Sequence, residues 1–165
     1  MLLNAPWQPS IKSIQRGQFT TTGTSQTISI SSVDTTKAII RVSDGTSDNV
    51  MNNIDYAVVF ASSTQLTLTV NTWTVGRTIN WEVIEFYNVK SLQTGSYVLS
   101  TGSGVEQSIT ISSVDVTKAL LFISETTNNA TAAGVAINRI KTATSIGVLT
   151  WSTTKTIKWQ VIEFN

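Results

Sequence analysis

The chain has 165 residues, with eleven basic and ten acidic side chains, no cysteine and no histidine. The scattered, balanced charge argues against a nucleic acid or membrane partner, and no apolar run reaches the ~20 residues of a membrane span. The lack of cysteine excludes a disulfide scaffold. The lack of histidine removes the usual general base and metal ligand, so we expect no enzyme, no catalytic residue and no cofactor.

The first ten residues, MLLNAPWQPS, differ from everything that follows. Leu2, Leu3 and Trp7 are apolar, and Pro6 and Pro9 oppose a regular helix or a central strand. The segment is too short for a signal-peptide core and lacks a basic start. Two interpretations stay open: a strap over the adjacent core, or an arm whose apolar side chains are assembly contacts on a neighbouring subunit.

The rest of the chain predicts strands, because period-two alternation is frequent and no helical apolar stripe persists. Neutral hydroxyls, from 27 Thr and 20 Ser, supply the polar faces. Residues 37–42 are apolar on both faces for part of their length, which indicates a central strand. The first six predicted strands are Ile11–Thr20, Gln26–Ile30, Lys37–Ser43, Asp55–Ala61, Gln65–Val70 and Thr78–Phe86. The next six are Val89–Ser100, Gln107–Ser112, Lys118–Ser124, Gly134–Ile140, Thr144–Thr150 and Thr156–Phe164.

These two sets of strands belong to an internal repeat. QTISISSVDTTKA, starting at Gln26, returns as QSITISSVDVTKA at Gln107, and TINWEVIEF at Thr78 returns as TIKWQVIEF at Thr156. The offsets are 81 and 78, so one loop gained three residues and another lost them. We predict an all-β chain of two tandem antiparallel sandwich or barrel modules, 11–87 and 88–165, after an N-terminal arm, 1–10. The link, Tyr87-Asn88, is too short to be flexible.

Two acidic positions recur in both modules. Asp34 and Asp115 follow Ser-Ser-Val, where a carboxylate fixes a turn by accepting backbone N–H groups, so we assign them a structural role. Glu85 and Glu163 fall on the core side of their strands by alternation. Either a bulge near Val83 turns Glu85 outward, or it is buried against a cation such as Lys12 or Arg16.

One loop has the oxygen-rich look of a cation site. Asp44-Gly45-Thr46-Ser47-Asp48-Asn49 has two carboxylates, but its counterpart at 125–129 has one, and calcium loops need six or more oxygen ligands. A polar loop tip explains this composition, so we expect no metal.

Tryptophans recur in pairs as well. Trp81 and Trp159 lie in mid-strand with apolar neighbours on their face, so we expect core residues. Trp73 and Trp151 fall near turns, close to Arg77 or Lys155. They are either lids held by a cation–π contact or, alternatively, platforms for stacking glycans.

Three motifs carry a resemblance to a known group: Lys-Ser-(Ile/Leu)-Gln-x-Gly at Lys12 and Lys90, Ile-x-Ile-Ser-Ser-Val-Asp-x-Thr-Lys-Ala at Ile28 and Ile109, and Trp-x-Val-Ile-Glu-Phe at Trp81 and Trp159. Together they resemble Ser/Thr-rich β modules of tailed-bacteriophage virion proteins, which include capsid decoration and tail or fibre components. The resemblance covers nearly everything after residue 10. It implies a structural role in a multimer, and it carries over no functional residue.

The sequence therefore predicts a non-enzymatic virion structural protein, most simply a decoration or cement protein that bridges capsid subunits. The expected partners are the major capsid protein or another virion protein, and further copies of the chain; a trimer would suit capsid threefold positions. The expected location is the virion, after synthesis in the host cytoplasm. The alternative is a tail, baseplate or fibre component that binds a host glycan through Trp73 and Trp151. A cellular adhesion module is a third interpretation, disfavoured by the missing signal peptide.

Overall fold

The computed structural model describes residues 9–44, 56–70, 76–99, 104–127, 135–150 and 155–165. Over these residues the regular structure is entirely β, as predicted, and the twelve strands lie where the sequence placed them, with ends shifted by at most three residues. The first module contains β1 (Ile11–Thr20), β2 (Ser25–Ser29), β3 (Ala38–Asp44), β4 (Tyr56–Ser62), β5 (Gln65–Val70) and β6 (Thr78–Phe86). The second contains β7 (Val89–Leu99), β8 (Gln107–Thr110), β9 (Ala119–Thr127), β10 (Val135–Thr142), β11 (Ser145–Thr150) and β12 (Lys155–Phe164).

Each module is a sandwich of two three-stranded antiparallel sheets. In the first module the sheets have the strand orders β1-β6-β3 and β2-β5-β4, and in the second β7-β12-β9 and β8-β11-β10. The sheets of each module enclose their own apolar core, which includes Leu66 and Ile79 in the first and Ile146 and Ile157 in the second. The tandem sandwich predicted from the repeat is therefore the observed fold.

The strand registers refine how the repeat diverged. Ser62 pairs with Gln65 at the end of the β4–β5 hairpin, and Thr142 pairs with Ser145 in β10–β11, an offset of 80 (142 − 62). Because the offset is 81 at β3 and 78 at β6, one residue was lost between β3 and β4 and two between β5 and β6. The sequence had assigned the whole loss to a single loop.

The prediction that residues 37–42 form a central strand is wrong. β3 lies at the edge of its sheet, and β6 is central. β3 is apolar on both faces for another reason: Ile40 packs in the core of its own module, whereas Ile39, on the opposite face, packs against the second module.

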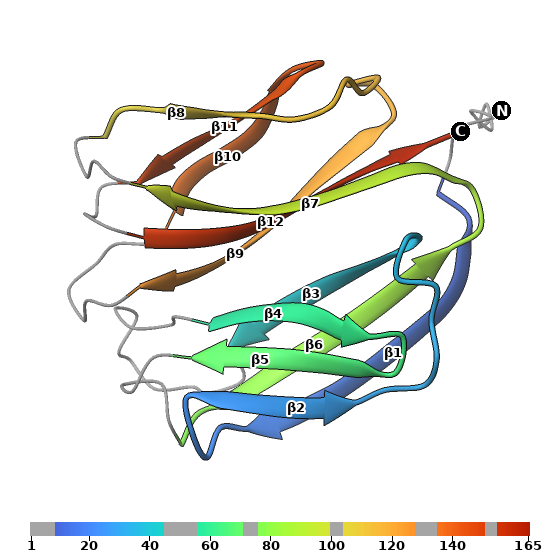
Figure 1. Cartoon of the computed structure of the whole chain (residues 1–165), viewed down its shortest axis with the longest axis vertical. Coiled ribbons are helices and arrows are strands. Elements are labelled where there is room, and N and C mark those ends of the chain that lie inside the picture. The colour runs from blue at the N-terminus through green and yellow to red at the C-terminus, as the bar shows by residue number, and fades with distance from the viewer. Residues whose placement is uncertain (1–8, 45–55, 71–75, 100–103, 128–134, 151–154) are drawn as a thin grey trace, which may run out of the picture.

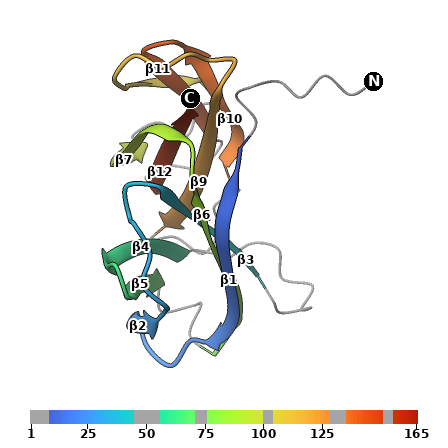
Figure 2. The ribbon, with the colours of Figure 1, turned by 90° about the vertical axis from the view of Figure 1, so that its right-hand side faces the viewer.

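The modules meet in a contact that we call the seam (Figures 1 and 2). A third apolar cluster fills it near the link, and Phe86 and Phe164, which are repeat counterparts, touch edge to face with ring centroids 5.1 Å apart. Farther along, Tyr56 of β4 pairs with Glu125 of β9, which joins two sheets into the order β2-β5-β4-β9-β12-β7. The second module thus covers the side of the first where the edge strands β3 and β4 adjoin.

Candidate functional site

The polar feature that both modules share is a buried glutamate at the end of each last strand. Glu85 is 2% exposed and Glu163 is 1% exposed. Lys12 Nζ lies 2.8 Å from Glu85 Oε1, Ser13 Oγ donates to Oε2 over 3.2 Å, and the Asp34 N–H donates to Oε1 over 3.0 Å. The carboxylate thus fastens the start of β1 and the turn between β2 and β3 to β6.

The second module repeats this arrangement. Lys90 Nζ lies 2.8 Å from Glu163 Oε1, Ser91 Oγ donates over 3.2 Å, and the Asp115 N–H donates over 2.9 Å. Of the two alternatives from the sequence, burial against a cation is correct and a bulge at Val83 is absent, because β6 pairs with β1 in continuous register from residue 78 to 85.

Electrostatics keep both glutamates ionised. Burial raises the pKa of Glu85, but the hydrogen bonds from Lys12, from the Asp34 N–H and from Ser13 outweigh it, so the pKa lies below its usual value of 4.5. The pKa of Glu163 is lowered by the corresponding balance. A carboxylate meant to shuttle protons near neutral pH would need the opposite shift, so the arrangement suits a structural ion pair.

The remaining positions of the Lys-Ser-x-Gln-x-Gly motif also serve the fold. Gln15 ties β1 to the segment that follows β2: its Nε2 donates to the Ser31 carbonyl over 2.9 Å and its Oε1 accepts the Ser31 N–H over 2.7 Å. Gln93 makes the same pair of bonds to Ser112, at 3.0 and 2.7 Å. Sequence reasoning missed this role, although the recurrence of glutamine in both motifs was an available signal.

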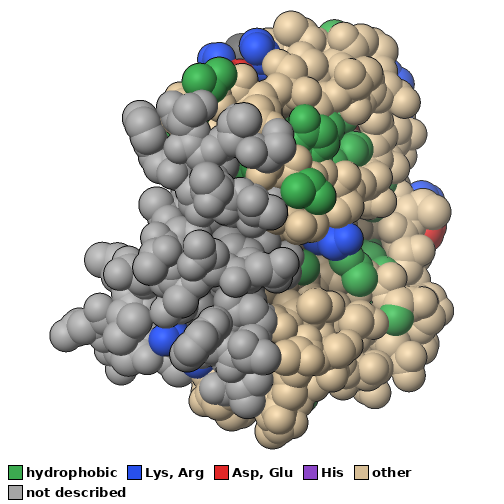
Figure 3. Space-filling view, turned by 60° about the vertical axis from the view of Figure 1, so that its left-hand side comes forward, with side chains coloured by type: hydrophobic (Ala, Val, Ile, Leu, Met, Phe, Trp, Pro, Cys, Tyr) green, Lys and Arg blue, Asp and Glu red, His purple; other side chains and the backbone are tan. Residues whose placement is uncertain are grey.

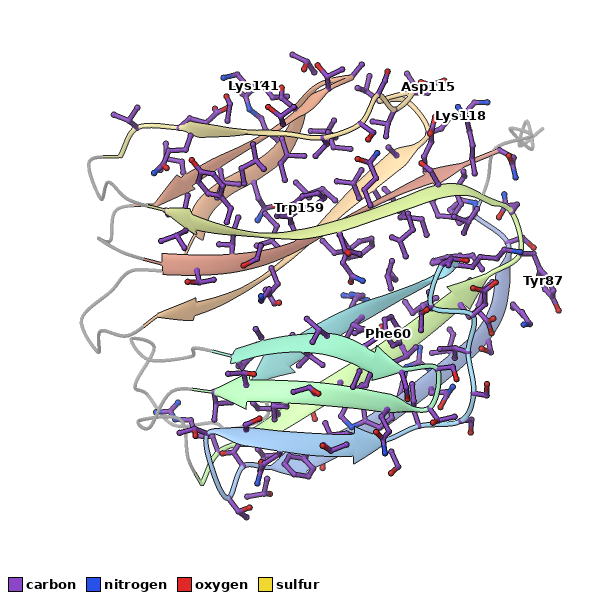
Figure 4. The ribbon with its side chains drawn as sticks, in the orientation of Figure 1. Phe60, Tyr87, Asp115, Lys118, Lys141 and Trp159 are labelled. Carbon is purple, nitrogen blue, oxygen red and sulfur yellow. The ribbon has the colours of Figure 1, made fainter. Side chains whose placement is uncertain are left out.

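The motif glycine makes room for the tryptophan opposite. Gly17 pairs with Trp81 and Gly95 pairs with Trp159 across neighbouring strands. A Cβ on Gly17 would lie 2.6 Å from the Trp81 ring, far inside van der Waals contact. A Cβ on Gly95 would clash with the Trp159 ring in the same way. Trp159 is buried in the core, whereas Trp81 is half-buried against it. Figure 4 shows Trp159 within the second module.

The paired aspartates hold the β2–β3 and β8–β9 turns. Asp34 Oδ1 accepts the Thr36 N–H over 3.0 Å and the Thr36 hydroxyl over 2.6 Å. Asp115 accepts from Thr117 over 3.0 and 2.7 Å. These bonds to threonine are the main reason that the pKa of each aspartate is lowered. Lys37 lies 3.9 Å from Asp34, an exposed ion pair worth little by itself.

A cavity of about 460 Å³ lies in the seam. One wall is the face of the β7-β12-β9 sheet turned away from its own core, and the other is the β3–β4 side of the first module, including Val58. Phe60, on the same side, is labelled in Figure 4. Gln160 Oε1 crosses the seam to accept the Ile40 N–H over 3.0 Å, which satisfies a backbone group on the edge of β3. In the space-filling view, apolar and basic side chains gather where the two halves meet (Figure 3).

Several residues singled out in the sequence lie outside the described part of the chain: Leu2, Leu3, Trp7, Trp73, Trp151, the residues after Asp44 in the acidic loop, and the later residues of its counterpart. Ser10, at the base of the arm, is described. Its N–H donates to Asn88 Oδ1 over 2.8 Å, and its carbonyl accepts the Tyr87 N–H over 2.8 Å. The arm therefore starts at the link between the modules.

Among the described residues, no three His, Cys, Asp or Glu side chains gather as metal ligands. Nor does that part of the chain contain a helix long and apolar enough to cross a membrane. Comparison of the chain with protein-family models, curated proteins and solved structures finds no match.

Proposed function

We propose that this chain is a non-enzymatic structural protein of a tailed-bacteriophage virion, and first of all a capsid decoration protein. The observation that carries this proposal is the use of the repeated polar residues. Glu85, Lys12, Ser13, Gln15 and their counterparts are committed to hydrogen bonds that close each sandwich. The duplication has therefore kept a scaffold in both copies rather than a reactive site.

The junction of the modules also supports a role in assembly. The two-residue link and the seam hold the sandwiches in one arrangement, so the chain presents surfaces at fixed spacing. Asn88 fastens the base of the arm through Ser10 and the end of β12 through the Asn165 N–H, which donates to the Asn88 carbonyl over 3.0 Å. A rigid arrangement suits a decoration protein, because a preorganised body loses less conformational entropy when it binds a lattice, and the lattice in turn stabilises its fold.

Binding to particles tests the proposal. The purified chain would be mixed with capsids of the phage whose genome encodes it and sedimented, with expected saturable binding and a raised capsid melting temperature. A chain lacking residues 1–8 should remain folded by circular dichroism, and its loss of binding would assign the arm to the neighbouring subunit. Absence of binding by the full chain, together with saturable quenching of tryptophan fluorescence by host glycans, would contradict decoration and favour the glycan-binding alternative.

A further inference from the structure

The repeat presents one surface twice, once covered and once open. We call the faces of the β1-β6-β3 and β7-β12-β9 sheets that are turned away from their own cores the outer faces. In the second module nine residues of the β7-β12-β9 sheet line the seam cavity: Thr94, Gly95, Ser96, Phe122, Ile123, Ser124, Lys158, Trp159 and Gln160. In the first module a hollow of about 430 Å³ is lined by their nine counterparts: Arg16, Gly17, Gln18, Arg41, Val42, Ser43, Asn80, Trp81 and Glu82.

What differs is the occupant. The second module's outer face holds the β3–β4 side of the first module, with Ile40, Val58 and Phe60 opposite it. The first module's hollow is lined, as far as the chain is described, by its own sheet alone. On the β9–β10 side of the second module, which corresponds to the β3–β4 side of the first, β9 meets the first module at the Tyr56–Glu125 pair and along the seam cavity. Val116 and Leu120, before and at the start of β9, remain exposed. The outer face of the first module and this exposed part of the β9–β10 side are therefore without a partner among the described residues.

Exposed apolar side chains mark both of these surfaces. Of the eight large apolar side chains that the described residues expose, four are counterparts of residues in the seam. Ile11 and Ile14, in the first module, correspond to Val89 and Leu92, which pack in the seam cluster. Val116 and Leu120, in the second, correspond to Thr35 and Ile39, and Ile39 is 1% exposed whereas Leu120 is 45% exposed. Clustered exposed apolar groups of this kind mark interaction sites.

We propose that the outer face of the first module binds the β9–β10 side of a second copy of this chain, as the second module binds the β3–β4 side of the first. The contact is head-to-tail, so copies joined in this way form a ring if the rotation closes and a filament if it does not. Ile84, Phe86, Ile162 and Phe164 are already buried in or beside the seam, so the contact between copies is smaller than the seam.

The polar groups fit the same arrangement. Glu82 is the counterpart of Gln160, which accepts the N–H of Ile40 across the seam. In the contact between copies, Leu121 takes the place of its counterpart Ile40. The Leu121 N–H would therefore donate to the Glu82 carboxylate. Arg16 and Arg41 lie 2.5 and 3.1 Å from Glu82.

On the other side of the contact, Arg139 and Lys141 lie 2.7 and 3.6 Å from Glu106. Arg139 is the counterpart, by the hairpin registers, of Val59 in the seam cavity. In the proposed contact Glu82 of one copy faces Arg139 of the other, and Arg16 faces Glu106. Each carboxylate thus meets a guanidinium group, so the charges of the two surfaces are complementary.

Sedimentation velocity of the full chain tests the inference. Joining two surfaces by a short link gives them an effective concentration of at least about 1 mM. Separate copies lack this advantage, so the measurement should extend to roughly 1 mM. The expected result is a mass that rises with concentration. Ile14→Glu on the face and Leu120→Glu on the opposite side should each abolish the rise, because each buries a charge in the contact. Val98→Glu is the matched control: Val98 is also an exposed apolar residue, but it lies on β7, outside both proposed contact surfaces and outside the seam cluster and cavity.

Mixing the two variants gives the decisive result. Ile14→Glu keeps an intact β9–β10 side and Leu120→Glu keeps an intact outer face, so an equimolar mixture should form one-to-one dimers and nothing larger. Three outcomes would overturn the proposal: a monomer up to roughly 1 mM, no dimer in the mixture, or an equal effect of Val98→Glu. The inference stands on the repeat geometry alone, so a chain that self-associates without binding capsids would support it and contradict the assignment to the virion.

Discussion

Glu85 and Glu163 accept the same three hydrogen bonds at distances that agree within 0.1 Å. On the opposite face of the same two strands, Glu82 carries two exposed arginines, whereas Gln160 lies in the seam and binds a backbone N–H. The two modules thus agree inside and differ outside. Residues that close a sandwich have the same task in both copies, while residues on the outer faces meet water in one and protein in the other.

The largest difference should come from the tryptophans. Trp159→Ala removes a buried indole and should lower the free energy of unfolding by about 3–5 kcal/mol. Trp81→Ala removes a half-buried one and should cost less, because the space it leaves is open to water. Urea unfolding of both variants measures the difference, and equal losses would show that the two cores are more alike than their exposure suggests.

The buried glutamates should behave alike. Glu85→Gln and Glu163→Gln each keep the shape of the side chain but replace charge-assisted hydrogen bonds by weaker ones, at an expected cost of about 2 kcal/mol each. Equilibrium unfolding measures both losses. Glu82→Gln is the control: it weakens only ion pairs with exposed arginines, so its free energy of unfolding should fall by less than about 0.5 kcal/mol. A loss in one module only would contradict the equivalence of the two networks.

Acid should remove the same stabilisation. The pKa values of Glu85 and Glu163 are lower in the folded chain than the ordinary value of 4.5. Their contribution to stability is therefore complete above that ordinary value, which applies to the unfolded chain, and is lost as the pH falls through the folded-state pKa. Thermal melts between neutral pH and pH 2 should show the melting temperature falling in acid, with a shallower fall in the double glutamine variant. Some slope should remain, since the pKa values of Asp34, Asp115 and Glu106 are lowered too. Parallel curves for both proteins would contradict this.

The smallest effect concerns the seam. Gln160→Ala leaves the Ile40 N–H without its acceptor, and an unsatisfied buried group predicts a loss of about 1 kcal/mol. Amide hydrogen exchange at Ile40 should report the change directly. The matched variant Glu82→Ala breaks only exposed ion pairs and should leave that amide unchanged.

The sequence was sufficient for the strands and for the tandem organisation, because period-two alternation and the repeat are local signals. It could not place β3: the apolar Ile39 faces another module, and alternation alone does not distinguish a second module from a second sheet. The Glu85 network was half predicted. The alternation identified a buried carboxylate, but Lys12 and Arg16 were equal candidates until the β1 register placed Lys12 beside it and Arg16 beside Glu82. Gln15 and Gln160 were missed, since their partners are backbone groups distant in sequence.

Asn88 has a mechanical consequence. It is hydrogen-bonded both to Ser10 before β1 and to Asn165 after β12, so a load applied at those two residues enters the molecule at a single point. From there the load peels β1 from β6 and β12 from its neighbours one bond at a time, rather than shearing whole ladders at once. Force spectroscopy with the load applied at Ser10 and Asn165 should therefore record a low unfolding force. A load applied at one point within each module should record a higher unfolding force.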